Sequence, residues 1–163
     1  MDNADSPQPS VITGSDMLRQ AVLELVDETQ RYLTIFSFDF ENEIYSNREF
    51  VDGLSAVARG TRRAEVRILL HEPKQMLASQ HQAVTLLQRL SSLIEARRLD
   101  SQYHDQRQCY IISDRQRMIY RPSSERYEAL RINDGNRIRE VNQHFEQMWQ
   151  QSHIASELRR QML

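Results

Sequence analysis

The sequence contains only one cysteine, Cys109, among its 163 residues. A single thiol excludes an intramolecular disulfide and the zinc sites built from several cysteines, and it is typical of a reducing compartment. The apolar runs are only a few residues long, and the first residues lack the basic and hydrophobic regions of a signal peptide. We therefore expect a cytoplasmic protein that does not cross a membrane.

Glycine is also scarce, with four residues that lie far apart in the chain. The sequence therefore offers no glycine-rich phosphate loop, which disfavours nucleotide binding of the P-loop or Rossmann kind. The five histidines are spread singly, and none has the H-E-x-x-H spacing that places two zinc ligands on one helical turn. We expect neither a metal site nor a cofactor.

No charge of one sign dominates, because 21 basic residues face 23 acidic ones and the formal net charge is -2. This balance gives no overall attraction to nucleic acid or to anionic lipid. The basic residues are nearly all arginine, since Lys74 is the only lysine. Any basic surface must therefore be local, and the arginines of three clusters could converge into a patch that follows phosphates: residues 59–67, 97–98 and 115–121.

The length fits one domain with a single core. Residues 1–14 are predicted to be a disordered leader or a linker from a larger polypeptide, because the first ten are polar and hold two of the four prolines. The domain itself is expected to span residues 15–152. Residues 153–163 are expected to form a helical tail that could dock on a partner.

The pattern of elements predicts a mixed, mostly parallel α/β sheet flanked by helices. Apolar residues at helical spacing predict a helix from residue 15 or 16 to about 31, a second from Asn47 to Gly60, a third over 75–90 and a last one opened by Asp134. Short β-branched and aromatic runs predict strands at 32–38, 64–70, 93–99, 108–113, 117–121 and 127–132. Alternating helices and strands favour parallel strands in the first half, whereas residues 108–121 read as an antiparallel hairpin.

Three features together resemble one half of a phospholipase-D-like domain: the order of elements, the segment RGTRRAEVRILL and the closing segment NQHFEQMWQQS. The resemblance covers most of residues 17–152. In that family an H-x-K-x4-D motif lies on a strand and turn and is followed by G-S-x-N. The resemblance implies a phospholipase-D-like fold, and because active members bring two half-sites together, it also implies a homodimer.

The apolar strand that ends in an aspartate places Asp114 at the acid position of this motif. Counting back along the strand puts Arg107 at the histidine position and Cys109 at the lysine position. Counting forward, Arg121 and Pro122 replace the Gly-Ser pair, and Ser124 stands at the asparagine position. Only the acid of the motif is retained.

These replacements predict that the domain has lost phosphodiesterase activity. The family uses its histidine as a nucleophile, whereas a guanidinium stays protonated and has no lone pair with which to attack. Arginine can still bind phosphate, so Arg107 and Arg121 are candidate anion ligands and Asp114 is a candidate acid that orients one of them. The alternative is that the pocket is gone and these are solvated residues at strand ends.

His104 offers a second register of the motif, in which Gln106 replaces the lysine and Ile111 replaces the acid.

Three functional hypotheses follow. The first is a non-catalytic module for protein interaction or regulation, with a phosphate-containing ligand as an option. The second is a phosphodiesterase or nuclease with an unorthodox centre around His104 and Asp114. The third is nucleic-acid binding without catalysis.

Overall fold

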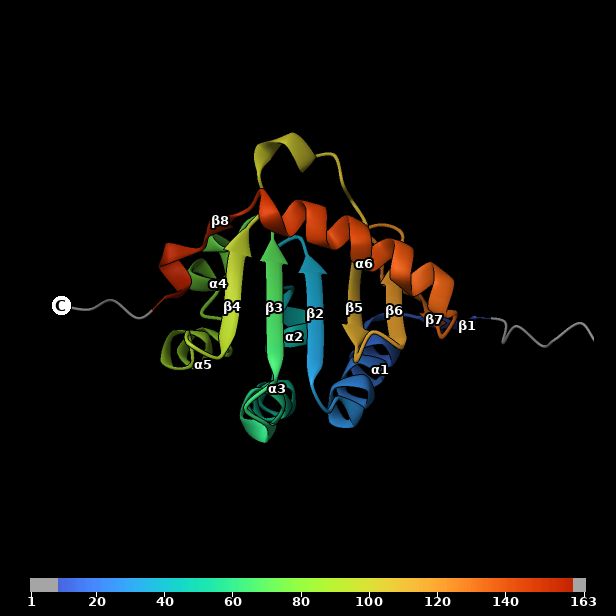
Figure 1. The fold of residues 1–163 in the computed structure, drawn as a ribbon, viewed down its shortest axis with the longest axis horizontal. Coiled ribbons are helices and arrows are strands. Elements are labelled where there is room, and N and C mark those ends of the chain that lie inside the picture. The colour runs from blue at the N-terminus through green and yellow to red at the C-terminus, as the bar shows by residue number, and fades with distance from the viewer. Residues whose placement is uncertain (1–8, 160–163) are drawn as a thin grey trace, which may run out of the picture.

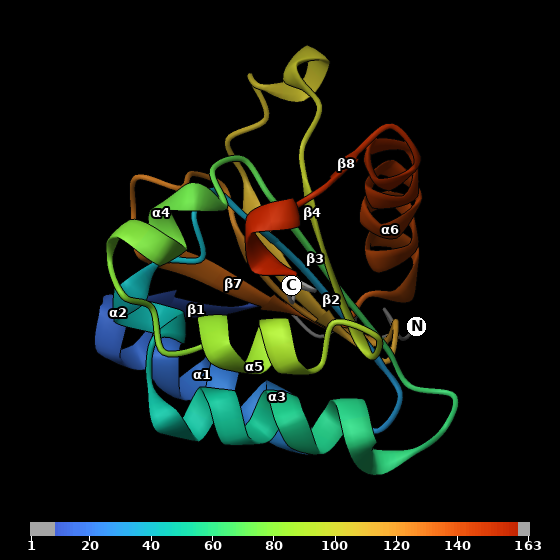
Figure 2. The same cartoon turned by 90° about the vertical axis from the view of Figure 1, so that its left-hand side faces the viewer.

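The computed structural model describes residues 9–159, which form three layers around one sheet. The eight strands lie in the order β1-β7-β6-β5-β2-β3-β4-β8. They span Ser10–Thr13 (β1), Tyr32–Ser37 (β2), Glu65–Leu70 (β3), Ile94–Arg98 (β4), Cys109–Ser113 (β5), Arg117–Arg121 (β6), Glu128–Ile132 (β7) and His153–Ile154 (β8). Most helices cover one face of this sheet, and a single long helix crosses the other face (Figure 2).

The helices are Ser15–Glu28 (α1), Asn42–Tyr45 (α2), Arg48–Gly60 (α3), Lys74–Ala78 (α4), Val84–Arg89 (α5) and Gly135–Gln150 (α6), with 3₁₀ turns at Ser101–Tyr103 and Ser156–Leu158. As expected, Asn47 caps α3, since its side-chain oxygen accepts a hydrogen bond of 2.8 Å from the Phe50 amide. The predicted helix over residues 75–90 is instead two short helices. The chain breaks between them at Gln80, whose φ of 55° does not fit a continuous helix.

Two hydrophobic clusters hold the layers together. The larger one lies between the sheet and helices α1, α3 and α5 and includes Leu18, Phe50 and Ile68. The smaller one lies under α6, where Phe145, Met148 and Trp149 pack on Phe36 and other residues of the central strands. The apolar stripe of the closing segment is therefore core, which accounts for its helical spacing.

The sheet is mixed, as predicted, but the expectation of mostly parallel pairing is wrong. Only β2–β3 and β3–β4 are parallel, and the other five pairings between the described strands are antiparallel. Short connections account for the β5–β6 and β6–β7 pairs, because a turn of a few residues can join only antiparallel neighbours. The other three antiparallel pairs join strands that are far apart in the chain. Figure 1 shows β2, β3 and β4 running in one direction and β5 running against them.

The ends of the chain differ from the predicted leader and tail. Residues 10–13 form β1, which pairs with β7, so the leader cannot extend to residue 14. At the other end His153 and Ile154 form β8 beside β4 instead of a helix, and only a 3₁₀ turn follows. Residues 1–8 and 160–163, the rest of both predicted segments, lie outside the described residues. No helix among residues 9–159 is long and apolar enough to cross a membrane.

His81 is buried at 4% exposure and fixes the break between α4 and α5. Its Nδ1 accepts a hydrogen bond of 3.0 Å from the Ala83 amide, so its Nε2 carries the proton and donates to the Phe40 carbonyl at 2.7 Å. Burial lowers the pKa of His81 from 6.5 to about 4, although the bond to Phe40 acts in the opposite direction. The folded domain therefore holds this imidazole neutral.

The neutral His81 makes the stability of the domain sensitive to acid. The unfolded chain binds a proton near pH 6.5 and the folded chain only near pH 4, so this contribution is complete above pH 6.5 and declines as the pH falls toward 4. Urea unfolding of the wild type at pH 7 and pH 5 should show this loss. The His81→Gln variant should be less stable at pH 7 and lose less on acidification. An equal loss in both proteins would contradict the assignment.

Candidate functional site

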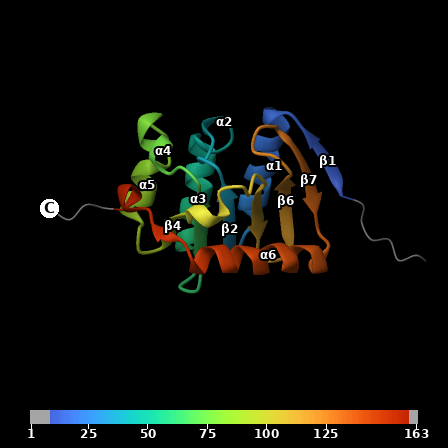
Figure 3. The same ribbon diagram turned by 90° about the horizontal axis from the view of Figure 1, so that it is seen from above.

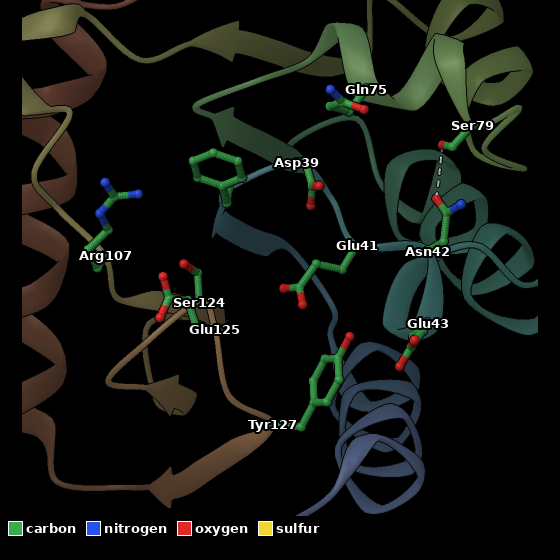
Figure 4. A pocket seen from close by; sticks show the side chains of 11 residues that line it. Asp39, Glu41, Asn42, Glu43, Gln75, Ser79, Arg107, Ser124, Glu125 and Tyr127 are labelled. Atoms are coloured by element: carbon green, nitrogen blue, oxygen red, sulfur yellow. Dashed lines mark hydrogen bonds between the residues drawn. The ribbon is translucent and has the colours of Figure 1, made fainter.

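A cavity of about 470 Å³ lies where β2 ends and β5 begins. Ligands of α/β proteins commonly bind at the carboxyl ends of parallel strands, the position that this cavity occupies beside β2. Figure 4 shows side chains from several loops pointing into it. They belong to Phe38, Asp39, Glu41, Asn42, Glu43, Gln75, Ser79, Arg107, Ser124, Glu125 and Tyr127.

Arg107 lines the cavity from the segment that precedes β5, and its side chain is exposed. The ring of His71 lies nearby at the end of β3, stacked against Phe36 and Phe38 at centroid distances of 5.6 and 5.0 Å. Burial lowers the pKa of His71, and the positive charge of Arg107 adds to this effect. The position that corresponds to the nucleophile of the phospholipase-D-like motif therefore holds a solvent-facing guanidinium.

Arg121 lies at the end of β6, directly across from Cys109 in the sheet, and is only 3% exposed. Its guanidinium forms a two-pronged ion pair with the carboxylate of Glu41, and the second prong measures 3.1 Å. The same group donates to the carbonyl of Ser124 at 3.1 Å and to that of Arg126 at 2.9 and 3.1 Å. Arg121 is therefore committed to partners within the domain.

Cys109, at the lysine position, is 2% exposed and belongs to the core. Burial raises the pKa of its thiol to about 11, which keeps it protonated at neutral pH. Ser124, at the asparagine position, does line the cavity. The structure thus brings the counterparts of the histidine, the lysine and the G-S-x-N segment to one end of the sheet. Of these, only Arg107 and Ser124 face the space in which a ligand would lie.

Asp114 lies at the opposite end of β5, away from this cavity. Its carboxylate accepts backbone hydrogen bonds from Gln30 at 2.9 Å, Arg31 at 2.8 Å and Tyr32 at 2.9 Å. Burial opposes ionisation, but these amides and Arg117 outweigh it and lower the pKa of Asp114. The expected pairing of Asp114 with Arg107 or Arg121 is therefore absent from the structure, and the acid ties β2 to the β5–β6 turn.

His104 lies just beyond the 3₁₀ turn between β4 and β5, in a loop that projects past the sheet (Figures 1 and 2). Its side chain is exposed, and its Nδ1 lies 2.8 Å from the Ser101 carbonyl. Since His104 precedes β5 and Asp114 follows it, the strand separates the two residues of the unorthodox centre. Within residues 9–159 there is also no group of three or more metal-ligating side chains that could hold an ion.

The cavity is rich in carboxylates. Asp39, Glu41, Glu43 and Glu125 line it, against a single lining arginine, Arg107. Burial raises the pKa of Asp39 more than its backbone hydrogen bond and Arg121 lower it. Burial, together with a hydrogen bond to Glu43, likewise raises the pKa of Tyr127 to about 12. Such a lining attracts cationic groups and repels phosphate.

Sequence reasoning did not identify the acidic lining as part of the site. The sequence does contain a local indication of this lining, the acidic segment DFENEI, which begins one residue after the strand β2 and so lies at a strand end. Nothing local in the sequence indicates that Glu125 and Tyr127 line the cavity. They belong to the β6–β7 connection, which lies beside the cavity because of the order of the strands in the sheet.

Solved structures show which fold this is. Nuc from Salmonella typhimurium, described as a phospholipase D family member, is 16% identical with a TM-score of 0.62, and the match covers 90% of this chain and 98% of that one. NucT from Helicobacter pylori is 12% identical with a TM-score of 0.61 and the same coverages. The fold is therefore phospholipase-D-like, as the sequence motifs implied.

A third similar structure is TrmBL2, an archaeal chromatin protein described as showing a novel mode of DNA binding. It is 17% identical with a TM-score of 0.65, and the match covers 94% of this chain but only 56% of that one. The chain thus spans little more than half the length of TrmBL2. A comparison with curated protein sequences finds no match.

The sequence itself matches the profile of one protein family over residues 14–161. This range includes every described element from α1 onward, and it contains the candidate site as a whole. The chain therefore belongs to the family described as a domain of unknown function, DUF7931.

Proposed function

We propose that this domain is a non-catalytic phospholipase-D-like module that acts in protein interaction or regulation. The observation that carries the proposal is the Arg121–Glu41 ion pair beside the cavity, together with Arg107 at the nucleophile position and the buried Cys109 at the lysine position. Among residues 9–159, the positions that correspond to the family's histidine and lysine thus hold neither a nucleophile to attack a phosphodiester nor a free cation to hold one.

The lining charges support a binding role for the cavity that does not depend on phosphate. A phosphate would meet one guanidinium, that of Arg107, and three carboxylates, since the fourth, Glu41, is paired with Arg121. Arg121 adds little, because Glu41 already neutralises it. The cavity is therefore a better match for a cationic group of a partner protein than for a phosphate-containing ligand bound at Arg107.

A phosphodiesterase assay tests the absence of catalysis. We expect no turnover of bis(p-nitrophenyl) phosphate or of labelled DNA above a buffer blank, with or without Mg²⁺, Mn²⁺ or Zn²⁺. Turnover that the His104→Ala substitution abolishes and the His144→Ala substitution leaves intact would overturn the proposal in favour of the unorthodox centre. Both histidines occur outside the buried core, so both variants should fold.

The proposed module is a cytoplasmic homodimer or a part of a larger assembly. The family resemblance to paired half-sites supports self-association, and the free buried thiol of Cys109 is typical of a reducing compartment. Light scattering coupled to size-exclusion chromatography would distinguish a dimer from a 19.3 kDa monomer.

A second candidate function is nucleic-acid binding without catalysis. The similarity to TrmBL2 supports it at the level of the fold. A specific surface also favours it, since exposed arginines gather at the end of the sheet opposite the acidic cavity.

A further inference from the structure

Three connections lie side by side at the end of the sheet that is opposite the cavity, where β2 and β3 begin and β5 ends. They are the α1–β2 loop, the α3–β3 loop and the β5–β6 turn, and the strands β3, β2 and β5 that they adjoin are neighbours in the sheet. In Figure 1 this edge lies at the bottom, at the start of β2 and β3. Neighbouring strands are about 4.8 Å apart, so side chains on these connections form a short row.

Five exposed arginines lie on these connections or, for one of them, in the last turn of α3. We call them the arginine edge: Arg31, Arg59, Arg62, Arg63 and Arg115. Their connections touch one another. The Nε of Arg31 donates to the Arg63 carbonyl at 3.2 Å, and the Glu65 amide donates to the Arg31 carbonyl at 2.8 Å. The guanidinium groups of Arg31 and Arg115 both lie over the ring of Tyr32, at 4.6 and 4.0 Å from its centroid.

Little negative charge offsets the arginine edge. Among residues 9–159 the only ion pair of its five members joins Arg115 to Glu65, at 3.8 Å between two half-exposed side chains. The nearby Asp114 already accepts three backbone amides, and Glu28 is paired with Arg117 at 2.5 Å. Four guanidinium groups are therefore left to solvent or to a ligand.

The two ends of the domain also differ in charge, which adds to the effect of the arginine edge. Four carboxylates line the cavity at one end of the domain. At the other end Glu28, Glu65 and Asp114 are already bonded within the domain, and four of the five arginines have no ion pair among residues 9–159. A polyanion is thus repelled by one end of the domain and attracted by the other, which orients its approach.

We propose that the arginine edge binds the phosphate backbone of a nucleic acid. The inference rests on the second candidate function and adds its surface and chemistry. Duplex DNA carries about one negative charge per 1.7 Å of axis, and a row of planar guanidinium groups suits bidentate contacts to successive phosphates. The occupant is a nucleic acid and not a lipid surface, because the edge presents a single exposed large apolar residue nearby, Leu93.

This binding should not depend on the base sequence of the nucleic acid. The arginine edge consists of the end of helix α3, two loops and the β5–β6 turn, so it presents chain connections, and not the side of a helix, to a groove. Contacts to phosphates position a protein without reading bases, so affinity should depend on salt far more than on sequence.

The experiment measures binding of the full chain to a fluorescein-labelled 20-base-pair duplex by anisotropy between 25 and 200 mM salt. We expect the logarithm of the association constant to fall linearly with the logarithm of salt, with a slope of about -3 for three phosphates. The double variant Arg62→Gln, Arg63→Gln should bind at least about tenfold more weakly at low salt and show a slope that is smaller by about two. Both side chains are exposed, so we expect the double variant to fold.

The matched control changes the charge by the same amount at the other end of the domain, in the variant Arg48→Gln, Lys74→Gln. It should bind within about twofold of the wild type, because neither residue lies on the arginine edge. An equal loss in both double variants would overturn the inference, since it would show a response to net charge alone.

Two further outcomes would each overturn it in a different way. If Arg107→Gln abolishes binding and the Arg62, Arg63 variant does not, the nucleic acid occupies the cavity, and the second candidate function survives without this surface. If the wild type shows no salt-dependent binding to DNA, that candidate function fails as well. Sedimentation with phosphatidylserine vesicles in place of DNA would then identify a lipid surface.

Discussion

Replacing Arg121 with alanine should lower the free energy of unfolding by about 3–5 kcal/mol, the usual cost of leaving one member of a buried ion pair alone. The side chain of Arg121 is 4% exposed and that of Glu41 is 13% exposed, so water cannot freely replace either partner. The substitution also removes the donor for the carbonyls of Ser124 and Arg126. Urea unfolding measures this loss, which corresponds to a melting temperature lower by about 10 °C.

The neighbouring Arg126 provides the control, because its carbonyl takes part in this network whereas its side chain is exposed. The Arg126→Ala variant should stay within about 0.5 kcal/mol of the wild type. The double variant Glu41→Leu, Arg121→Met should recover part of the loss, since apolar groups of similar size do not leave a buried charge unpaired. A loss below about 1 kcal/mol for Arg121→Ala would show that the ion pair does not hold the cavity wall.

This ion pair also explains why the candidate site was only partly predictable from the sequence. The motif register identified Arg107 and Arg121 as counterparts of catalytic positions, and the structure places both near the cavity. The partner of Arg121 is Glu41, 80 residues earlier, and nothing local in the sequence links the two. Whether an arginine is a ligand or a structural cation depends on such distant contacts, which periodicity and spacing do not report.

The elements that were predicted well are those whose signals are local. Helix α3 has a capping asparagine, an apolar stripe and a terminal glycine within one segment, and strands β5 and β6 are separated by a short turn. Such signals do not need the rest of the chain. The phospholipase-D-like fold followed from their order together with the family motifs.

The elements that were missed are stabilised by distant partners. Strand β1 has four residues, three of them exposed, and it forms only because β7 offers an edge more than 100 residues later. Strand β8 has two exposed residues beside β4. Neither carries enough apolar periodicity to be recognised alone, so the sequence favoured a leader and a tail. The prediction of a mostly parallel sheet was wrong for the same reason, since β5 lies next to β2 and runs antiparallel to it.

Replacing Asp114 with alanine should destabilise the domain by about 2–4 kcal/mol, because three backbone amides lose a charged acceptor and the most buried of them cannot be fully rehydrated. The carboxylate receives Gln30 on one oxygen and Arg31 and Tyr32 on the other. Asp114 also has a positive φ of 51°, a conformation that aspartate tolerates better than alanine does. The acid thus fixes both the start of β2 and the β5–β6 turn.

The ionised form of Asp114 makes the hydrogen bonds, so the effect of a neutral substitute should depend on pH. Because the pKa of Asp114 is lower in the folded state than the ordinary value of 3.8, its contribution is present above pH 3.8 and is lost as the pH falls through the folded-state pKa. The stability difference between the wild type and Asp114→Asn should therefore be large at pH 7 and shrink at pH 3. The exposed Asp105→Asn variant should show no such change. A difference that is the same at both values would mean that a carboxylate is not needed here, and that Asp114 is retained for its backbone conformation alone.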